Sequence, residues 1–195
     1  MAEKFLVKET AERLVHNELS NAAYWFLKVA KEKIEAGERQ GVAIEMIAGL
    51  IFCEFSVEAK LNFVGWKYFE DGWPERASFR EKTMLLNKAL DLNLSWGERP
   101  LQTLKDLMRF RNALAHGQPE VVDIERVVDV EPEIWDILKS DWEQSVNVEF
   151  LERCREDEGV FWEALLKSAG ISKSNTLTSG HQSITVLREE AEKNF

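Results

Sequence analysis

Residues 41 to 66 form the longest apolar segment of this chain and constrain its fold more than any other stretch. Apolar side chains lie almost all the way round the helix that this segment predicts, rather than along one stripe. Such a helix is either buried on every side or spans a membrane. The charged residues in the segment argue against a membrane span, and they are Glu45, Glu54, Glu58 and Lys60. We therefore expect a buried central helix.

Helical periodicity predicts further helices on both sides of this segment. Their expected ranges are 8–37, 79–92, 100–116 and 148–169, with a weaker pattern at 132–138. Ser78 and Glu81 have the spacing of a capping box, which starts a helix. Gly117 and Gly170 follow two of the ranges directly and suit helix ends. We expect residues 1–170 to form one all-α domain, a bundle of four or five helices.

Two segments have no clear helical pattern. Residues 121–124 and 127–130 are rich in valine and isoleucine, and are expected to be short strands or extended loop. The polar residues 171–195 are expected to be a flexible C-terminal tail, with a short helix possible at 187–195.

Charge limits the partners of the chain. With 25 basic and 35 acidic residues, the formal net charge is −10, which opposes general attraction to nucleic acid or anionic lipid. A polyanion would need a local patch such as Lys105, Arg109 and Arg111, although these residues are equally typical of an ordinary solvated surface. The chain also lacks metal-ligand spacing, a disulfide framework and a signal-peptide core. We expect a cytoplasmic protein that uses no cofactor or metal and does not enter a membrane.

The most informative polar cluster lies at the end of the predicted 100–116 helix. Arg111 and Asn112 are adjacent, and the small or apolar residues 113–115 separate them from His116. Asn112 and His116 are four residues apart and share a helix face, whereas Arg111 lies roughly 140° round the helix from His116. A cation and an imidazole suit phosphodiester chemistry. They also suit the negative end of a helix dipole, and from the residues alone this second explanation is favoured.

The run Arg111-Asn112-Ala113-Leu114-Ala115-His116 resembles the signature of the HEPN superfamily, in which an arginine, followed by a polar residue, is separated from a histidine by four to six residues; here the spacer is four residues. Upstream, the segment 55–65 is similar to the second helix of several HEPN groups, with Glu58 and Asn62 at the matching places. The resemblance covers about residues 10–117. It implies a helical bundle that pairs as a homodimer and brings two motifs together.

The resemblance also implies a function. Many HEPN domains are metal-independent endoribonucleases of toxin–antitoxin or antiviral systems. The 2′-hydroxyl of RNA attacks the adjacent phosphorus, which yields a 2′,3′-cyclic phosphate. By this resemblance His116 would move protons, Arg111 would hold the phosphate, and Asn112 would orient His116 or bind the phosphate. An RNA such as tRNA would be the substrate, and an antitoxin protein a possible partner. The alternative is a catalytically inactive module that binds RNA, a nucleotide or a protein.

Further polar residues are candidates for supporting roles, namely Glu54, Glu58, Asn62 and Arg109. Either glutamate would orient His116 or pair with Arg111, although a purely structural ion pair is the more common role of a buried carboxylate. Asn62 is either a buried hydrogen-bond anchor or a neighbour of the site. His16 and His181 receive no role.

Overall fold

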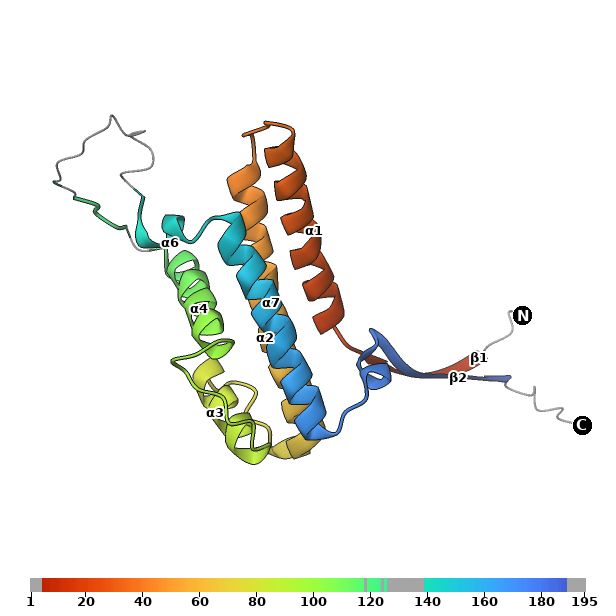
Figure 1. Cartoon of the computed structure of the whole chain (residues 1–195). Helices are drawn as coiled ribbons and strands as arrows, with labels where there is room; N and C mark the ends of the chain where they lie inside the picture. Colours follow the sequence, from red (N-terminus) through yellow and green to blue (C-terminus); the bar gives the residue numbers. More distant parts are fainter. Residues whose placement is uncertain (1–4, 118, 124, 126–138, 189–195) are drawn as a thin grey trace, which may run out of the picture.

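A computed structural model describes residues 5–117, 119–123, 125 and 139–188 of the chain. Its main body is a bundle of helices, as predicted (Figure 1). The bundle helices are α1 (His16–Glu35), α2 (Val42–Phe69), α3 (Phe79–Ala89), α4 (Leu101–His116) and α7 (Val148–Ala169). A single turn, α6 (Asp141–Gln144), precedes α7 and was not predicted.

Helix α2 is the centre of the bundle. It packs against α1, α3, α4 and α7, and leucines from several helices meet around it. Leu50, Leu61, Leu107, Leu151 and Leu165 are each at most 1 % exposed. The expectation drawn from its apolar character is therefore confirmed. No helix in the described part of the chain combines the length and apolar character needed to cross a membrane.

Local sequence signals set several helix ends. The Ser78 hydroxyl accepts a bond from the Glu81 amide, and the Glu81 carboxylate accepts one from the Ser78 amide at 2.8 Å. This is the predicted capping box. Gly117 and Gly170 end α4 and α7 in the left-handed region, with φ of 53° and 67°, which glycine adopts without the steric cost of a Cβ. Helix α7 spans the predicted residues 148–169.

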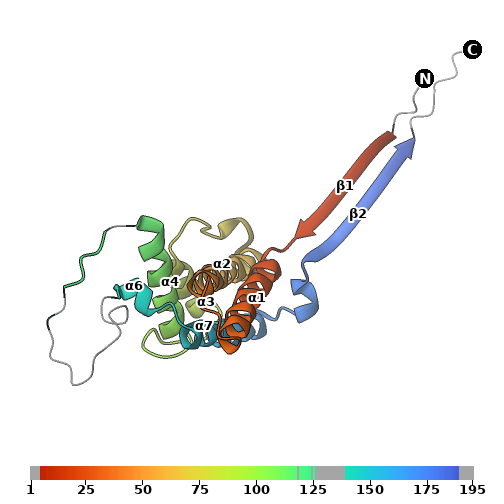
Figure 2. The same cartoon turned by 90° about the horizontal axis from the view of Figure 1, so that it is seen from above.

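The two ends of the described chain form a β-ribbon, which contradicts two predictions. Strand β1 (Phe5–Arg13) pairs antiparallel with β2 (Ser179–Arg188), and the ribbon projects from the bundle (Figures 1 and 2). The first helix therefore starts at His16, not at residue 8, and the tail is not simply a loose segment. Both errors have one cause: each strand is specified by a partner more than 160 positions away, which local periodicity does not reveal.

Other predictions concern the chain between α4 and α6. Residues 121–123 have no regular secondary structure, which agrees with extended loop. Residues 127–130 and the weak helical pattern at 132–138 lie outside the described residues, as do residues 189–195 of the possible C-terminal helix. A short 3₁₀ helix at Lys173–Thr176 leads from α7 towards β2.

His16 fastens the root of the ribbon to the bundle. Its side chain is 1 % exposed, and its ring lies 5.1 Å from the rings of both Phe63 and Trp162. Its Nε2 donates to the carbonyl of Thr176 at 3.2 Å, and the Leu14 amide donates to the carbonyl of Thr178 at 3.0 Å. The sequence suggested no role for His16. In the structure it is the first residue of α1, and its buried side chain anchors this helix end to the segment that leads to β2.

Protonation of His16 is expected to destabilise the fold. Burial lowers its pKa below the ordinary value of 6.5, and the nearby charge of Lys60 lowers it further, against the effect of the Thr176 carbonyl. In the pH range between the folded and unfolded pKa the unfolded chain binds more protons, so stability falls as the pH drops below about 6.5. Urea unfolding between pH 8 and pH 5 measures this fall. His16→Gln should show a shallower slope, and equal slopes would contradict the expectation.

Candidate functional site

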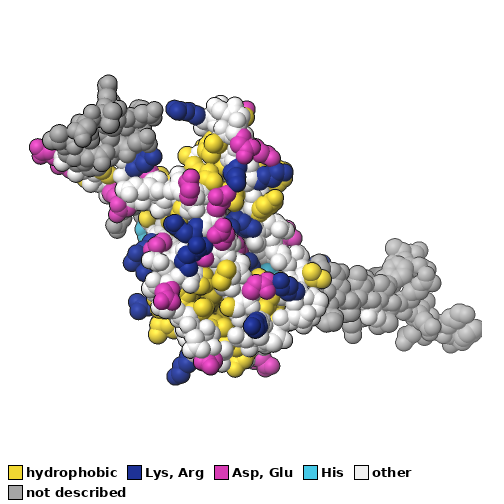
Figure 3. All heavy atoms as spheres, in the orientation of Figure 1, with side chains coloured by type: hydrophobic (Ala, Val, Ile, Leu, Met, Phe, Trp, Pro, Cys, Tyr) yellow, Lys and Arg dark blue, Asp and Glu magenta, His cyan; other side chains and the backbone are white. Residues whose placement is uncertain are grey.

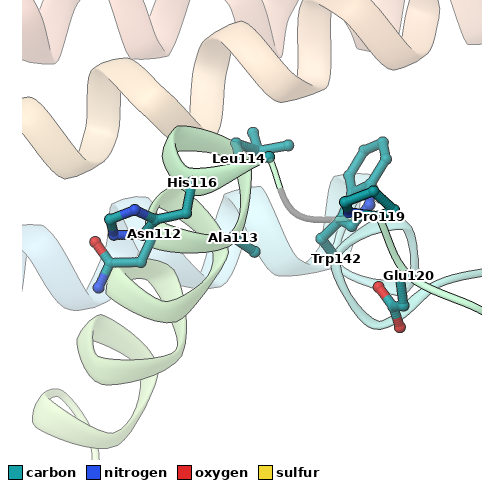
Figure 4. Close-up of a pocket in the computed structure, with 8 residues that line it drawn as sticks. Asn112, Ala113, Leu114, His116, Pro119, Glu120 and Trp142 are labelled. Atoms are coloured by element: carbon teal, nitrogen blue, oxygen red, sulfur yellow. The ribbon is translucent and has the colours of Figure 1, made fainter.

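The motif lies on the last turns of α4, which the apolar face of the helix holds in place. Leu104, Leu107 and Phe110 are at most 3 % exposed and face the interior of the bundle. Asn112 and His116 lie on the opposite, exposed face, and their side chains point to the same side of the helix (Figure 4). The helix remains regular through His116. The backbone therefore does not bend to bring Arg111 towards His116.

Arg111 points inward and is held by a buried carboxylate. Its Nε and Nη2 each donate to Oε1 of Glu54 at 3.1 Å. Glu54, on α2, is fully buried, whereas the Arg111 side chain is 32 % exposed. The remaining guanidinium nitrogen, Nη1, donates to Oδ1 of Asn112 at 2.9 Å. Of the two functional contacts considered for Glu54, the structure places it against Arg111.

The Glu54 carboxylate is an unusual ion-pair partner. Burial raises its pKa above the ordinary value of 4.5, an effect that the hydrogen bonds and charge of Arg111 oppose and that the nearby Glu58 reinforces. Its second oxygen, Oε2, is buried and has no hydrogen-bond partner among the described residues. The pair therefore carries a strong desolvation cost, and it fixes the position of the guanidinium group.

The other predicted supporting residues lie in separate contacts. Glu58 accepts a bond from the buried Lys82 of α3. Asn62 accepts a bond at 3.1 Å from the Trp73 indole, which packs so closely on Gly65 that an added Cβ would lie 2.3 Å from the ring. These contacts fix α3 and the loop before it against α2.

Positive charge around the motif is weaker than the sequence suggests. Arg109 is 72 % exposed and pairs with Asp106 at 3.3 Å, and Arg111 is paired with Glu54. Two of the three cations in the predicted strip therefore have a carboxylate beside them. Basic and acidic side chains are interspersed on the face of the molecule shown in Figure 3. An RNA would have to be bound by specific contacts rather than by a broad field.

A pocket of about 630 Å³ opens beside the end of α4. Its lining residues are Asn112, Ala113, Leu114, His116, Gly117, Pro119, Glu120 and Trp142. Figure 4 shows Trp142 and Glu120 beyond the helix end, on the other side of α4 from Asn112 and His116. The volume is within the usual range for a small ligand. Sequence reasoning missed Trp142, because nothing in the local pattern links α6 to the end of α4.

A second buried polar cluster between α2 and α7 was also missed. Glu158 is 2 % exposed and accepts bonds from Ser56, from Lys60 at 2.7 Å and from Arg155 at 3.3 Å. Lys60 is itself only 6 % exposed. The cluster lies inside the bundle, and we interpret it as a structural ion-pair network. Arg155 and Glu158 are three residues apart on one helix, but no sequence signal links Lys60 with Glu158, since 98 positions separate them.

The described residues contain no group of three or more histidine, cysteine, aspartate or glutamate side chains positioned to hold a metal ion. Comparisons of the chain with family models, curated proteins and solved structures find no match. The arrangement around α4 is thus the basis for a functional proposal: an exposed imidazole and amide on one helix face, and a guanidinium held by a buried carboxylate.

Proposed function

We propose that the chain is a metal-independent endoribonuclease of HEPN type, and that it acts as a homodimer on an exposed RNA loop such as that of a tRNA. A role as a toxin or antiviral effector would follow from such an activity. The observation that carries the proposal is the placement of Asn112 and His116. Both are exposed on one face of α4, and both line the same pocket.

The proposed reaction is an internal transesterification. The 2′-oxygen of the RNA forms a bond to phosphorus while the bond from phosphorus to the 5′-oxygen breaks. A neutral imidazole takes the proton from the 2′-hydroxyl, and a protonated imidazole gives one to the leaving 5′-oxygen. The products are a 2′,3′-cyclic phosphate and a 5′-hydroxyl. Histidine suits both roles near neutral pH, so His116 is the proposed proton carrier.

Arg111 and Asn112 are proposed to stabilise the charged phosphorane. Glu54 holds two nitrogens of the guanidinium at 3.1 Å, and the third, Nη1, contacts the exposed Asn112 at 2.9 Å. Hydrogen-bond donors that are already held in position before the reaction stabilise the charge of the transition state without any rearrangement of the protein. Glu54 would then be a positioning residue, since it acts through Arg111.

A homodimer would supply what one copy lacks. His116 of one chain offers a single imidazole, whereas the reaction uses an acid and a base. The partner subunit's His116 would provide the second group if the two α4 helices met at a two-fold axis. An isologous interface of this kind uses the same surface from both copies.

Cleavage of total tRNA in a chelating buffer tests the proposal. The wild-type chain should produce fragments with 2′,3′-cyclic phosphate and 5′-hydroxyl ends, identified by mass spectrometry. His116→Ala should lower the rate by about 10²–10⁴-fold, the usual contribution of general acid–base catalysis. Because His116 is exposed, the variant should keep its fold, which circular dichroism checks. Arg80→Ala, at an exposed position of α3 away from the motif, is the surface control and should retain most activity.

Mixing the wild-type and His116→Ala chains tests the shared site. Co-expression gives mixed dimers that contain a single intact His116. If both chains contribute an imidazole to one cleft, the mixed dimers should be as inactive as the His116→Ala dimer; if each chain has its own site, they should keep about half of the wild-type activity. Equal inactivity of wild type and His116→Ala in the tRNA assay would contradict the nuclease proposal as a whole.

One observation favours a second candidate, a catalytically inactive module that binds RNA or a nucleotide. The contact with Glu54 neutralises much of the Arg111 charge, and a phosphate would meet a weaker cation. Binding of tRNA without cleavage, lost on Asn112→Ala, would support this alternative.

A further inference from the structure

The β-ribbon is an interaction surface with two unequal edges. Its two strands are the whole sheet in the described part of the chain, and they leave the bundle on the side away from α4 (Figures 1 and 2). Each strand of such a ribbon directs about half of its backbone N–H and C=O groups away from the other strand. A ribbon of two strands is at best marginally stable in water. A further strand on one edge would therefore stabilise it.

The sequences of the two strands show which edge is suited to pairing. Strand β1 contains four charged residues among nine, namely Lys8, Glu9, Glu12 and Arg13. Charged residues on an edge strand hinder the addition of another strand. In β2 the stretch 181–187 contains no lysine, arginine, aspartate or glutamate, and includes the consecutive β-branched residues 184–186. Such residues favour strand pairing, so β2 is the edge open to a partner.

We propose that β2 pairs antiparallel with β2 of a second copy of this chain, about a two-fold axis perpendicular to the sheet. The product is a four-stranded sheet in the order β1–β2–β2–β1. Both outer edges are then the charged β1 strands, so the sheet does not grow beyond four strands. A foreign strand would instead leave its own outer edge open. Isologous pairing is thus the arrangement that uses the open edge and ends the sheet. This interface is separate from the α4 interface of the proposed function.

The register supports pairing near the end of the ribbon farthest from the bundle. There Leu6 lies opposite Leu187, and Val7 lies opposite Val186. At the root, Arg13 lies opposite Ser179, and the contacts of His16 and Leu14 fix the strands to the bundle. The apolar residue pairs therefore lie at the end of the ribbon farthest from the bundle, and we expect the two copies to pair there.

Single-cysteine cross-linking of the full-length chain tests this pairing. Cysteine is placed in turn at each position from 181 to 187, and mild oxidation is followed by non-reducing electrophoresis. The native Cys53 and Cys154 are fully buried, so a cross-linked dimer reports on the new residue. In a two-fold antiparallel pair, the dimer yield should peak at the one position on the axis. Two residues to either side, equivalent positions are ~13 Å apart, beyond the ~7 Å reach of a disulfide.

Matched variants in β1 provide the control. Lys8→Cys and Thr10→Cys lie on strands that are outermost in the proposed sheet, and should give no cross-linked dimer. Thr185→Lys, added to the best cross-linking variant, should lower its dimer yield several-fold because it places a charge on the pairing edge. No cross-link at any β2 position, equal cross-linking at all of them, or cross-linking through β1 would overturn the proposal. None of these results depends on cleavage of RNA, so the nuclease proposal is tested separately.

Discussion

Arg111→Ala is expected to destabilise the folded chain by about 3 kcal/mol at pH 8, in addition to any loss of activity. The variant leaves Glu54 fully buried without the cation that holds it at 3.1 Å. Removing one partner of a buried ion pair usually costs more than the pair contributes, because the remaining charge is unsolvated. The value lies at the low end of the usual range because Glu54 can take up a proton. Urea unfolding at pH 8 measures the loss.

The cost of Arg111→Ala should depend on pH in a defined direction. Burial already raises the pKa of Glu54 above 4.5, and loss of Arg111 raises it further. When a carboxyl has a higher pKa in the folded state, the folded chain binds more protons, and stability falls as pH rises through that range. The difference from wild type should therefore be smaller at pH 5 than at pH 8. If the stability difference between wild type and Arg111→Ala is the same at pH 5 and pH 8, Glu54 is not a buried, charged group in the variant.

Arg111→Lys separates the structural role of this residue from its proposed catalytic role. Lysine keeps a positive charge for Glu54 and should restore most of the stability. It lacks the planar fork that contacts Glu54 and Asn112 together, so cleavage should remain low. Arg109→Ala, on the exposed side of the same helix, should change stability by less than about 0.5 kcal/mol. Recovery of cleavage in Arg111→Lys would show that charge alone suffices.

Glu158→Leu is expected to have the largest effect on stability, about 3–5 kcal/mol. Glu158 accepts bonds from Ser56, Lys60 and Arg155 inside the bundle. Without it, the ammonium group of Lys60, which is only 6 % exposed, loses its counter-charge. Arg155 retains the Ser20 carbonyl at 2.8 Å, so most of the cost should come from Lys60. Equilibrium unfolding in urea measures the change.

A double-mutant cycle identifies the cause of that loss. The pair Lys60→Met with Glu158→Leu removes both buried charges, and replacement of a buried ion pair by apolar residues is often close to neutral. The double variant should therefore be more stable than Glu158→Leu alone. If the stability losses of Lys60→Met and Glu158→Leu simply add in the double variant, the ion pair does not cause the loss in Glu158→Leu. The loss would then come from the changed shape of the side chain at position 158.

Several parts of the fold could be predicted because their causes are local. The continuous apolar character of residues 41–66 predicted the central helix, and α2 is the helix that the others surround. Ser78 with Glu81 marked the start of α3, and Gly170 marked the end of α7. Each signal acts within a few residues of the structure that it specifies. The placement of Asn112 and His116 on one face of α4 likewise follows from their spacing.

The partners of the polar residues could not be predicted in the same way. From the sequence, Glu54 could contact either Arg111 or His116; in the structure it accepts hydrogen bonds from Arg111. Glu58 contacts Lys82 of α3, and Asn62 contacts Trp73. Their spacing on α2 nevertheless resembles that of the HEPN segment, which had made them candidates for the site. Helical periodicity gives the face of a residue on its own helix, but not the helix that packs against that face.

By itself, the sequence determined the helical character of the chain, the central position of α2 and the shared face of Asn112 and His116 on α4, because periodicity and capping act over a few residues. Only the tertiary structure decided that Arg111 is held by a buried glutamate, that Glu158 accepts bonds from both α2 and α7, and that residues 5–13 and 179–188 form a ribbon. Most of these contacts join distant residues: 57 positions separate Glu54 from Arg111, 98 separate Lys60 from Glu158, and the paired strands are more than 160 positions apart. Their formation depends on the packing of whole helices and strands, which no local pattern encodes.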